Sequence, residues 1–264
     1  MGFKLFKKTL IVFLVLAVAA AGFYFLYMRP RRVTPILMYH AVRDDRSSTL
    51  NVTPENFSRQ MAFLRESGYS VISLDDLVRH IRKGRRFVPG AVVITFDDGY
   101  EDNYFHAFPV LKKYDMPATI FLITGYTGTR KGYMKWDQVR AMMKSNIDFG
   151  GHTMNDVYLP SLEDDGRLWE EIYGCREDIL RNAGGEAGYF CYPIGGFNER
   201  VKNTVKKAGY KGACTTNRGD DRFNRDVYEL KRIKVTNSDM NKPLHFRAKL
   251  SGYYNLFRSV KSGE

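Results

Sequence analysis

The chain has 264 residues, of which 44% are hydrophobic, 14% are aromatic and 27% are charged. These values are typical of a folded globular protein and exclude an intrinsically disordered or collagen-like chain. The formal net charge is +12, and half of it comes from residues 1–32, which carry six basic residues and no acidic one. The sequence has no run of Lys and Arg with interleaved aromatic residues, so we expect no nucleic-acid partner.

The first apolar segment runs from Thr9 to Met28 without a charged residue. Its length is close to the roughly 20 residues that a bilayer-spanning helix needs. Ala17-Val18-Ala19 could serve as the cleavage site of a signal peptide, but the apolar run continues to Tyr27 and Met28. This continuation favours an uncleaved anchor over a signal peptide or a buried core helix.

Basic residues flank the apolar segment on both sides and leave its orientation open, but a short basic leader before a first apolar run favours an N-terminus on the inside. We therefore predict a cytoplasmic leader over 1–8, a transmembrane anchor over 9–28, a linker over 29–34 and one domain over 35–264. The domain is expected outside the cytoplasm, either in a periplasm or on the outer cell face.

Short apolar runs alternate with amphipathic patterns in the remaining chain. The apolar runs predict strands at 35–39, 69–72, 91–96, 118–123, near 151, at 188–192, 211–215 and 232–235. Helical spacing predicts helices from Pro54, with Thr53 as N-cap, and at 74–83, 103–114, 136–144, 166–182, 198–208 and from 243 onward. Such alternation predicts a parallel α/β fold, either an open doubly wound sheet or a barrel. Both folds place functional groups at the carboxyl ends of their strands.

Two adjacent carboxylates, Asp97 and Asp98, follow the strand at 91–96, and Gly99 turns the chain directly after them. In such a pair, one carboxylate can bind a metal while the other takes a proton. His152 and Asp156 follow a later strand with a spacing of four residues, so their side chains could face the same point. Together with one of the first two carboxylates they could form a three-ligand site with open positions.

A third cluster covers Phe190 to Asn198, where Pro193 and two glycines predict an irregular loop after a strand. Such a loop can present backbone N–H groups to a developing oxyanion. Each cluster alone also fits a helix cap, a surface histidine or an ordinary turn. All three, however, follow predicted parallel strands, which favours one shared site.

At this point the sequence resembles the polysaccharide deacetylases, carbohydrate esterase family four. The resemblance extends over roughly 35–235 and is closest to the branch of poly-N-acetylglucosamine deacetylases. It rests on the following strings: Ile36-Leu-Met-Tyr-His40, Thr95-Phe-Asp-Asp-Gly-Tyr100, Gly151-His-Thr-Met-Asn-Asp156, Phe190-Cys-Tyr-Pro-Ile-Gly195 and Leu230-Lys-Arg-Ile-Lys-Val235.

The resemblance implies a distorted (β/α)7 barrel and a metal-dependent hydrolase. Asp97 would be the general base, and Asp98 and His152 would be two metal ligands. The backbone N–H of Tyr192, beside Pro193, would stabilise the oxyanion. The family metal is usually zinc, with nickel, cobalt or iron as alternatives.

Two positions depart from the family pattern. Asp156 stands where the family has a second histidine, and we expect this carboxylate to be the third ligand because zinc accepts carboxylate oxygen. Cys191 stands where many members have an arginine that orients the base, and Arg232 is the expected substitute. The general acid stays open between His245, which matches the late histidine of the family, and His40 at the end of the first predicted strand; it could also be neither of them.

The expected function is hydrolysis of N-acetyl groups from an extracytoplasmic N-acetylhexosamine polysaccharide, with release of acetate. A polysaccharide-binding pseudoenzyme and an O-acetyl esterase or amidase on the same scaffold remain alternatives. Three cysteines are present, and only Cys191 and Cys214 fall in predicted strands that could bring them together in a disulfide. The oligomeric state is left open.

Overall fold

The computed structural model describes residues 2–45 and 47–258. It divides into two compact units, Met1–Arg32 and Val33–Glu264. The first unit contains helix α1 (Gly2–Phe23), which continues through a π-helical turn (Tyr24–Met28) and a 3₁₀ turn (Arg29–Arg31). From Phe6 to Arg31 this helix is 26 residues long, and its apolar side chains are exposed. Its length and composition therefore allow it to cross a bilayer.

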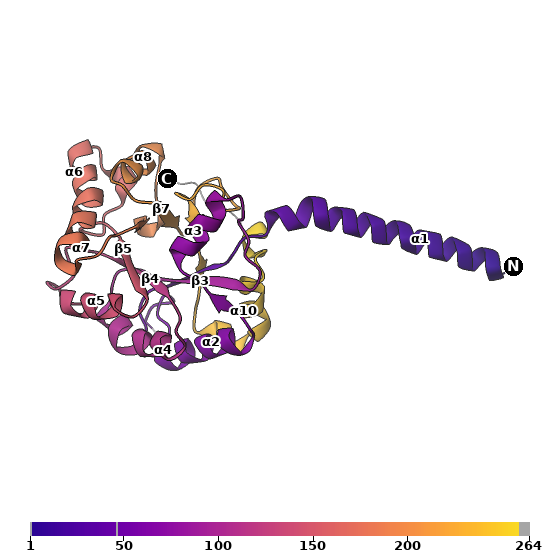
Figure 1. Ribbon diagram of the computed structural model, residues 1–264, viewed down its shortest axis with the longest axis horizontal. Helices are drawn as coiled ribbons and strands as arrows, with labels where there is room; N and C mark the ends of the chain where they lie inside the picture. The colour runs from indigo at the N-terminus through magenta and orange to yellow at the C-terminus, as the bar shows by residue number, and fades with distance from the viewer. Residues whose placement is uncertain (1, 46, 259–264) are drawn as a thin grey trace. The chain divides into compact units, whose positions relative to one another are not determined.

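The second unit is built on parallel strands (Figure 1). The strands are β1 (Ile36–Tyr39), β2 (Ser70–Val71), β3 (Ala91–Phe96), β4 (Ala118–Leu122), β5 (Ile147–Gly151), β6 (Tyr189–Cys191), β7 (Gly212–Thr215), β8 (Leu230–Lys231) and β9 (Ile233–Lys234). Their order in the sheet is β8-β7-β6-β5-β4-β3-β1-β9, and β2 pairs with β3. The sheet curls into a nearly closed barrel, as expected of a (β/α)7-like fold.

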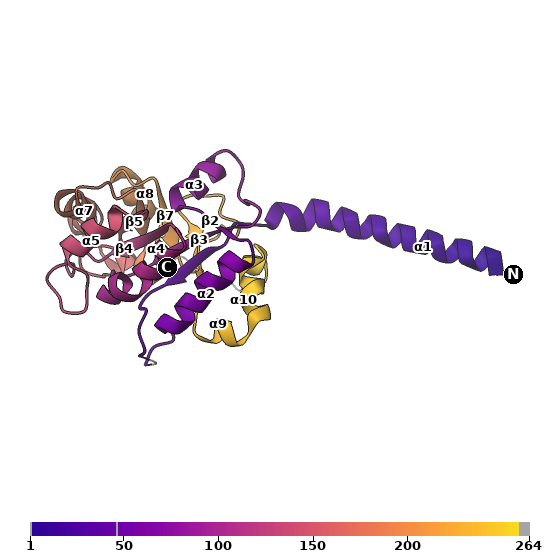
Figure 2. The same ribbon diagram turned by 60° about the horizontal axis from the view of Figure 1, so that its bottom comes forward.

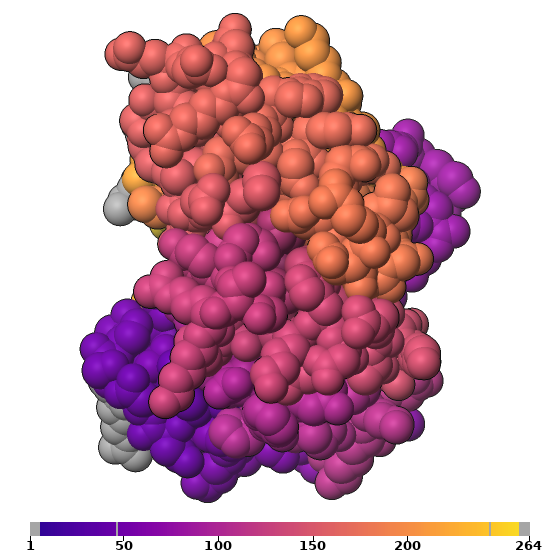
Figure 3. Space-filling view, turned by 90° about the vertical axis from the view of Figure 1, so that its left-hand side faces the viewer, coloured from indigo at the N-terminus to yellow at the C-terminus, as the bar shows by residue number. Residues whose placement is uncertain are grey.

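Helices pack around the barrel and against one of its ends (Figure 1). They are α2 (Pro54–Glu66), α3 (Leu74–Arg82), α4 (Phe108–Lys113), α5 (Trp136–Met143), α6 (Asp165–Trp169), α7 (Cys175–Ala183), α8 (Glu199–Lys207), α9 (Ser238–Asn241) and α10 (Pro243–Leu250). Thr53 caps α2 through its side chain, as predicted. The predicted helices at 103–114 and 166–182 are present but contain π-helical turns at Asn103–Ala107 and Glu170–Gly174. In Figure 3 the middle of the chain, from magenta to orange, forms a continuous surface over most of the face shown.

The core has two parts. The larger one packs outward-facing strand residues such as Leu37, Ile94 and Ile120 against the helices. The smaller one joins strand residues such as Ile36 and Val93 to the apolar side of α3. Because Ile36 and Val93 lie near the amino ends of β1 and β3, α3 closes that end of the barrel. The carboxyl ends of the strands remain for the functional site.

The barrel seam lies at Arg232. The predicted single strand at 232–235 is instead two short strands, β8 and β9, which flank this residue and form the two edges of the sheet. The Arg232 backbone N–H donates to Thr216 O at 3.2 Å, and its side chain is buried. The chain thus passes from one edge of the sheet to the other across a single arginine.

Candidate active site

Asp97 and Arg232 form a buried ion pair at the end of β3. The Arg232 Nη1 and Nη2 atoms lie 2.5 and 2.7 Å from Asp97 Oδ1 and Oδ2, so the contact is bidentate. Burial alone would raise the pKa of Asp97, but the Arg232 guanidinium and the nearby His40 and His152 hold it well below its usual range. Asp97 is therefore a carboxylate at neutral pH.

Asp98 points in a different direction because the backbone turns sharply after β3. Asp98 has φ +72°, and Gly99 has φ +76°. A Cβ on Gly99 would lie 2.6 Å from a methyl carbon of Leu122, so only glycine fits there. This turn brings Asp98 Oδ1 to 3.5 Å from His152 Nε2. The two adjacent aspartates thus have different partners, and their surroundings suit different roles.

His152 follows β5 and is held by its other ring nitrogen. Its Nδ1 lies 2.7 Å from the carbonyl oxygen of Cys191. Because a carbonyl only accepts, Nδ1 carries the proton, and the lone pair of Nε2 faces Asp98. Metal-bound histidines are commonly held in this way. Two atoms that each lie about 2.0–2.1 Å from a tetrahedral zinc are roughly 3.3–3.4 Å apart, which is close to the observed 3.5 Å.

Asp156 lies on the same loop in a strained conformation. It has φ +56°, and Thr153 has φ +65°. Its backbone N–H donates to Thr153 Oγ1 at 2.9 Å. Burial raises the pKa of Asp156, and the charges of His152 and Asp98 also act on it. Left-handed backbone at Asp98, Thr153 and Asp156 concentrates strain at one place, as is common at functional sites.

A more compact group of possible ligands lies deeper in the barrel. The ligand atoms of Asp97, His152 and Cys191 lie within 4.8 Å of one another, the one such group of three among the described residues. This group is poorly suited to a cation, because both oxygens of Asp97 are bonded to Arg232. Burial also raises the pKa of Cys191, so its sulfur is a neutral thiol, and Arg232 Nη2 lies 3.0 Å from it. Asp98 and His152 are therefore the better ligands.

Glu171 holds the loop that carries Asp156. This buried carboxylate accepts hydrogen bonds from the backbone N–H groups of Met154 and Asn155, both at 3.0 Å, and from Asn155 Nδ2 at 2.8 Å. The residue lies in the π-helical turn between α6 and α7, and nothing in the sequence singled it out. Its role depends on a contact between two distant segments.

His40 directly follows β1 and lies beside Asp97. Its Nε2 is 3.6 Å from Asp97 Oδ2. Burial lowers the pKa of His40, with Asp97 and Asp98 acting in the opposite sense. The backbone carbonyl of His40 accepts a hydrogen bond from Asn103 Nδ2 at 2.9 Å, which fixes this part of the chain.

A loop after β4 forms one wall of the site. Its backbone bonds to the His152 loop through Thr124 and Gly125, and Met134 N–H donates to Gly99 O at 2.9 Å. The rings of Tyr133 and Tyr100 are in tilted contact, with centroids 5.1 Å apart. The wall therefore connects the loop of Asp97 and Asp98 with the loop of His152 and Asp156. Half-buried tyrosines lie beside Asp98 at this wall.

Comparison with known proteins identifies the family. A family model described as polysaccharide deacetylase matches residues 85–213. A putative polysaccharide deacetylase of Bacillus subtilis, YxkH, is 31% identical over 211 residues, which is 76% of this chain and 71% of that protein. The chain belongs to the polysaccharide deacetylase family. The predicted family and enzyme class are confirmed.

Two further matches extend over most of this deacetylase. A poly-beta-1,6-N-acetyl-D-glucosamine N-deacetylase of Staphylococcus epidermidis is 26% identical over 226 residues, or 80% of this chain and 78% of that protein. The Streptococcus pyogenes deacetylase PplD, solved in complex with acetate, superposes with a TM-score of 0.75 at 26% identity. That match covers 83% of this chain and 99% of PplD. The predicted barrel fold is confirmed.

The expectation for Tyr192 needs correction in this deacetylase. Its backbone N–H donates to Cys214 O at 3.0 Å within the sheet, so it is not free for an oxyanion. Pro193 has no N–H to offer. Ile194, the next residue, has φ +57° and is 67% exposed, and its N–H has no hydrogen-bond partner among the described residues. A β-branched residue in this conformation is strained, which marks Ile194 as the better position for an oxyanion donor.

His245 lies in a different environment from the other predicted site residues. It is on α10, where its Nδ1 is 2.8 Å from Asp239 Oδ1, and its side chain is 46% exposed. Asp239 also bonds Lys249. No contact among the described residues joins His245 to Asp97, whereas His40 lies beside that carboxylate.

Proposed function

We propose that this polysaccharide deacetylase is a metal-dependent enzyme that removes N-acetyl groups from an extracytoplasmic N-acetylhexosamine polymer and releases acetate. The observation that carries the proposal is that the neighbouring residues Asp97 and Asp98 have different partners. Asp97 is held as a carboxylate by Arg232, while Asp98 faces the free nitrogen of His152. One residue is thus available for proton transfer and the other for binding a cation.

Asp98 and His152 would hold the cation, and we propose Asp156 as the third ligand. Its carboxylate does not lie within 4.8 Å of both other ligand atoms in this structure, so its side chain would have to turn towards the ion. Zinc is the favoured ion, since its ligands include imidazole nitrogen and carboxylate oxygen, and nickel, cobalt or iron are alternatives. When bound, a divalent cation acts as a Lewis acid towards the acetamide carbonyl.

Each proton transfer of the reaction is then assigned to a particular group of the site. Asp97 accepts a proton from the attacking water, and Arg232 keeps its carboxylate oriented. The Ile194 N–H, which has no other partner among the described residues, donates to the carbonyl oxygen as negative charge develops there. The proton taken by Asp97 is returned to the nitrogen of the breaking C–N bond, and His40, 3.6 Å from Asp97, is the group placed to carry it. Acetate and a free amine result.

The substrate assignment rests on two lines of support. Staphylococcal relatives named poly-beta-1,6-N-acetyl-D-glucosamine N-deacetylase match 70–80% of this chain. The exposed apolar helix from Phe6 to Arg31 also supports an anchor that holds the domain at a membrane, facing an extracellular polymer. We propose that α1 is this anchor and is not cleaved.

The test is acetate release by the full-length protein in detergent. We expect metal-dependent release from N-acetylglucosamine oligomers, loss of release with a chelator, and recovery on addition of zinc. Parallel assays with O-acetylated sugars separate an amidase from an esterase. Release from O-acetyl substrates alone, or release that is indifferent to the chelator, would contradict the proposal.

A further inference from the structure

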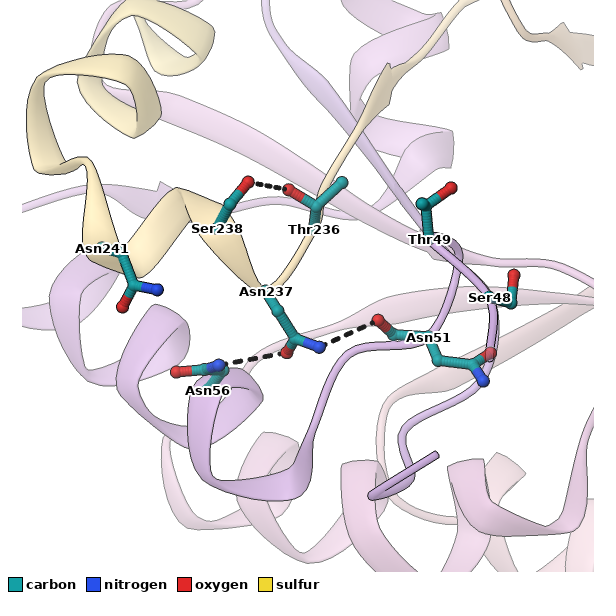
Figure 4. A pocket seen from close by; sticks show the side chains of 8 residues that line it. All are labelled: Ser48, Thr49, Asn51, Asn56, Thr236, Asn237, Ser238 and Asn241. Carbon is teal, nitrogen blue, oxygen red and sulfur yellow. Dashed lines mark hydrogen bonds between the residues drawn. The ribbon is translucent and has the colours of Figure 1, made fainter. Parts of the chain in front are cut away.

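A polar pocket lies beyond the carboxyl ends of β1 and β9, at the same end of the barrel as Asp97. Figure 4 shows the side chains that line it. It lies between the loop that follows β1, the start of α2 and the segment from β9 to α9. Its volume is about 410 Å³, which is within the range of about 300–1,000 Å³ for small-molecule sites. We call it the amide pocket. Its lining consists of Ser48, Thr49, Asn51, Asn56, Thr236, Asn237, Ser238 and Asn241.

The lining of the amide pocket is uniform in chemistry. Among the described residues, every lining side chain is a hydroxyl or a carboxamide, and none is charged or aromatic. Such groups both donate and accept hydrogen bonds, so they match ligands rich in hydroxyl and acetamido groups. The nearest printed charge is that of Lys234, whose Nζ donates to Thr49 Oγ1 at 2.7 Å, so a neutral polar ligand suits the lining better than an apolar one.

One wall of the pocket is held rigidly. Asn237 Oδ1 accepts from Thr53 N–H at 2.8 Å and from Asn56 Nδ2 at 3.0 Å, while its Nδ2 donates to Asn51 O at 3.3 Å. Figure 4 shows two of these bonds joining the three asparagines. Buried Asp239 accepts from the Thr236 N–H at 2.8 Å and thereby fixes the start of the same segment. A lining that is already in place loses little entropy on binding.

Some polar groups of the pocket remain available. The carboxamide of Asn241 is exposed and makes no hydrogen bond with another described residue. Figure 4 shows Asn241 and Asn56 on the helical side of the pocket and Thr49 and Ser48 on the side of the loop. Figure 2 shows α2, α9 and α10 grouped together at this part of the domain. A ligand between the two sides would meet donors and acceptors from both.

The amide pocket is connected to the active site through the chain after β1. His40 is followed by Ala41, whose carbonyl accepts the N–H of Val52 at 3.0 Å. Val52 directly follows Asn51 of the pocket. Since β1, β3 and β9 are parallel neighbours, the pocket and the Asp97 site open at the same end of the barrel.

We propose that the amide pocket binds a further sugar unit of the same polymer, at the end of the barrel where another unit has its acetamide cleaved at Asp97. This inference rests on the proposed deacetylase function and adds to it a requirement for a chain of sugars. The recognised groups are the neutral hydroxyl and acetamido groups of an N-acetylhexosamine. Long substrates then gain binding energy that the shortest substrates lack.

The test compares acetate release from N-acetylglucosamine oligomers of increasing length. Asn241→Ala removes a group that the fold does not use, and Asn241→Trp fills the pocket. We expect KM for long oligomers to rise about five- to tenfold in the first variant, the loss that one hydrogen bond brings, and more in the second. The KM for the shortest accepted substrate and kcat should stay as in the unmodified protein. Asn203→Ala, an exposed asparagine on α8, is the matched control.

Failure of this inference can be distinguished from failure of the proposed function. If the unmodified protein releases acetate but Asn241→Trp leaves the KM of every oligomer unchanged, the pocket is not a sugar site and the deacetylase function stands. If no oligomer yields acetate, binding of the same oligomers to the full-length protein is followed by saturation-transfer NMR. Equal signals for the unmodified protein and Asn241→Trp, or none, would also overturn the inference.

Discussion

Arg232 contacts both carboxylate oxygens of Asp97, at 2.5 and 2.7 Å, although the two residues are 135 positions apart. The same arginine is the one residue between β8 and β9, the two edges of the sheet. Closure of the barrel and orientation of the proposed base therefore depend on the same side chain.

Removal of the arginine charge should affect both stability and pH dependence. Arg232→Gln leaves Asp97 buried without its cation, and such losses typically cost about 3–5 kcal/mol of unfolding free energy. The pKa of Asp97 should rise, which moves the acidic limb of the rate profile to higher pH. Denaturant unfolding and a pH–rate profile measure the two effects. If the acidic limb of folded Arg232→Gln is unchanged, Arg232 does not lower the pKa of the catalytic base.

The same ion pair predicts how stability responds to acid. The folded-state pKa of Asp97 lies below its usual value, so its contribution is fully present above the unfolded-state pKa of about 4. That contribution is lost as pH falls towards the lowered pKa. Between pH 5 and pH 2 the unmodified protein should therefore lose more stability than Arg232→Gln. Parallel acid-dependent losses in both proteins would contradict the prediction.

Replacement of the proposed base should stop catalysis without removing the metal. We expect Asp97→Asn to lower kcat by at least about a hundredfold, the usual contribution of a general base. Its zinc content after dialysis should match that of the unmodified protein, because Asp98 and His152 are intact. Equal loss of zinc and activity would place Asp97 among the ligands.

Asp156 offers a test of the third ligand with a closely matched control. Asp156 and Asp115 both have positive φ, at +56° and +51°, a conformation that asparagine tolerates. We expect Asp156→Asn to weaken zinc binding about tenfold or more, since a charged ligand is lost. Asp115→Asn, in the turn before β4 at the opposite end of the barrel, should bind zinc normally. Titration with a competing chelator gives the affinities, and equal values would remove Asp156 from the metal site.

The two histidine candidates for proton transfer should behave differently. His40→Gln is expected to lower kcat at least tenfold, because His40 lies beside Asp97. His245→Gln should leave kcat unchanged, since His245 pairs with Asp239 and Lys249 holds that carboxylate as well. A loss of kcat in His245→Gln, with unchanged melting temperature, would reverse the assignment.

The fold was largely predictable from local patterns. The buried strand at 91–96 and the Thr53 cap are signalled by a few adjacent residues. The site was only partly predictable, because much of it depends on contacts between distant segments. Glu171 supports the Asp156 loop from another helical segment, and Arg232 reaches across the barrel. Tyr192 was misplaced because the hydrogen bond of its N–H to Cys214 depends on strand register.

The three cysteines, finally, have a consequence for the extracytoplasmic location that we propose. Cys175, Cys191 and Cys214 are free and buried, and burial raises the pKa of Cys175 and Cys214 to about 12. Reaction with oxidants requires an accessible thiolate, so burial protects these thiols in the folded protein at the extracytoplasmic location that we propose. The unfolded chain lacks this protection, and its thiols could form wrong disulfides. An exported chain, as we propose this one to be, must therefore fold before its thiols are oxidised.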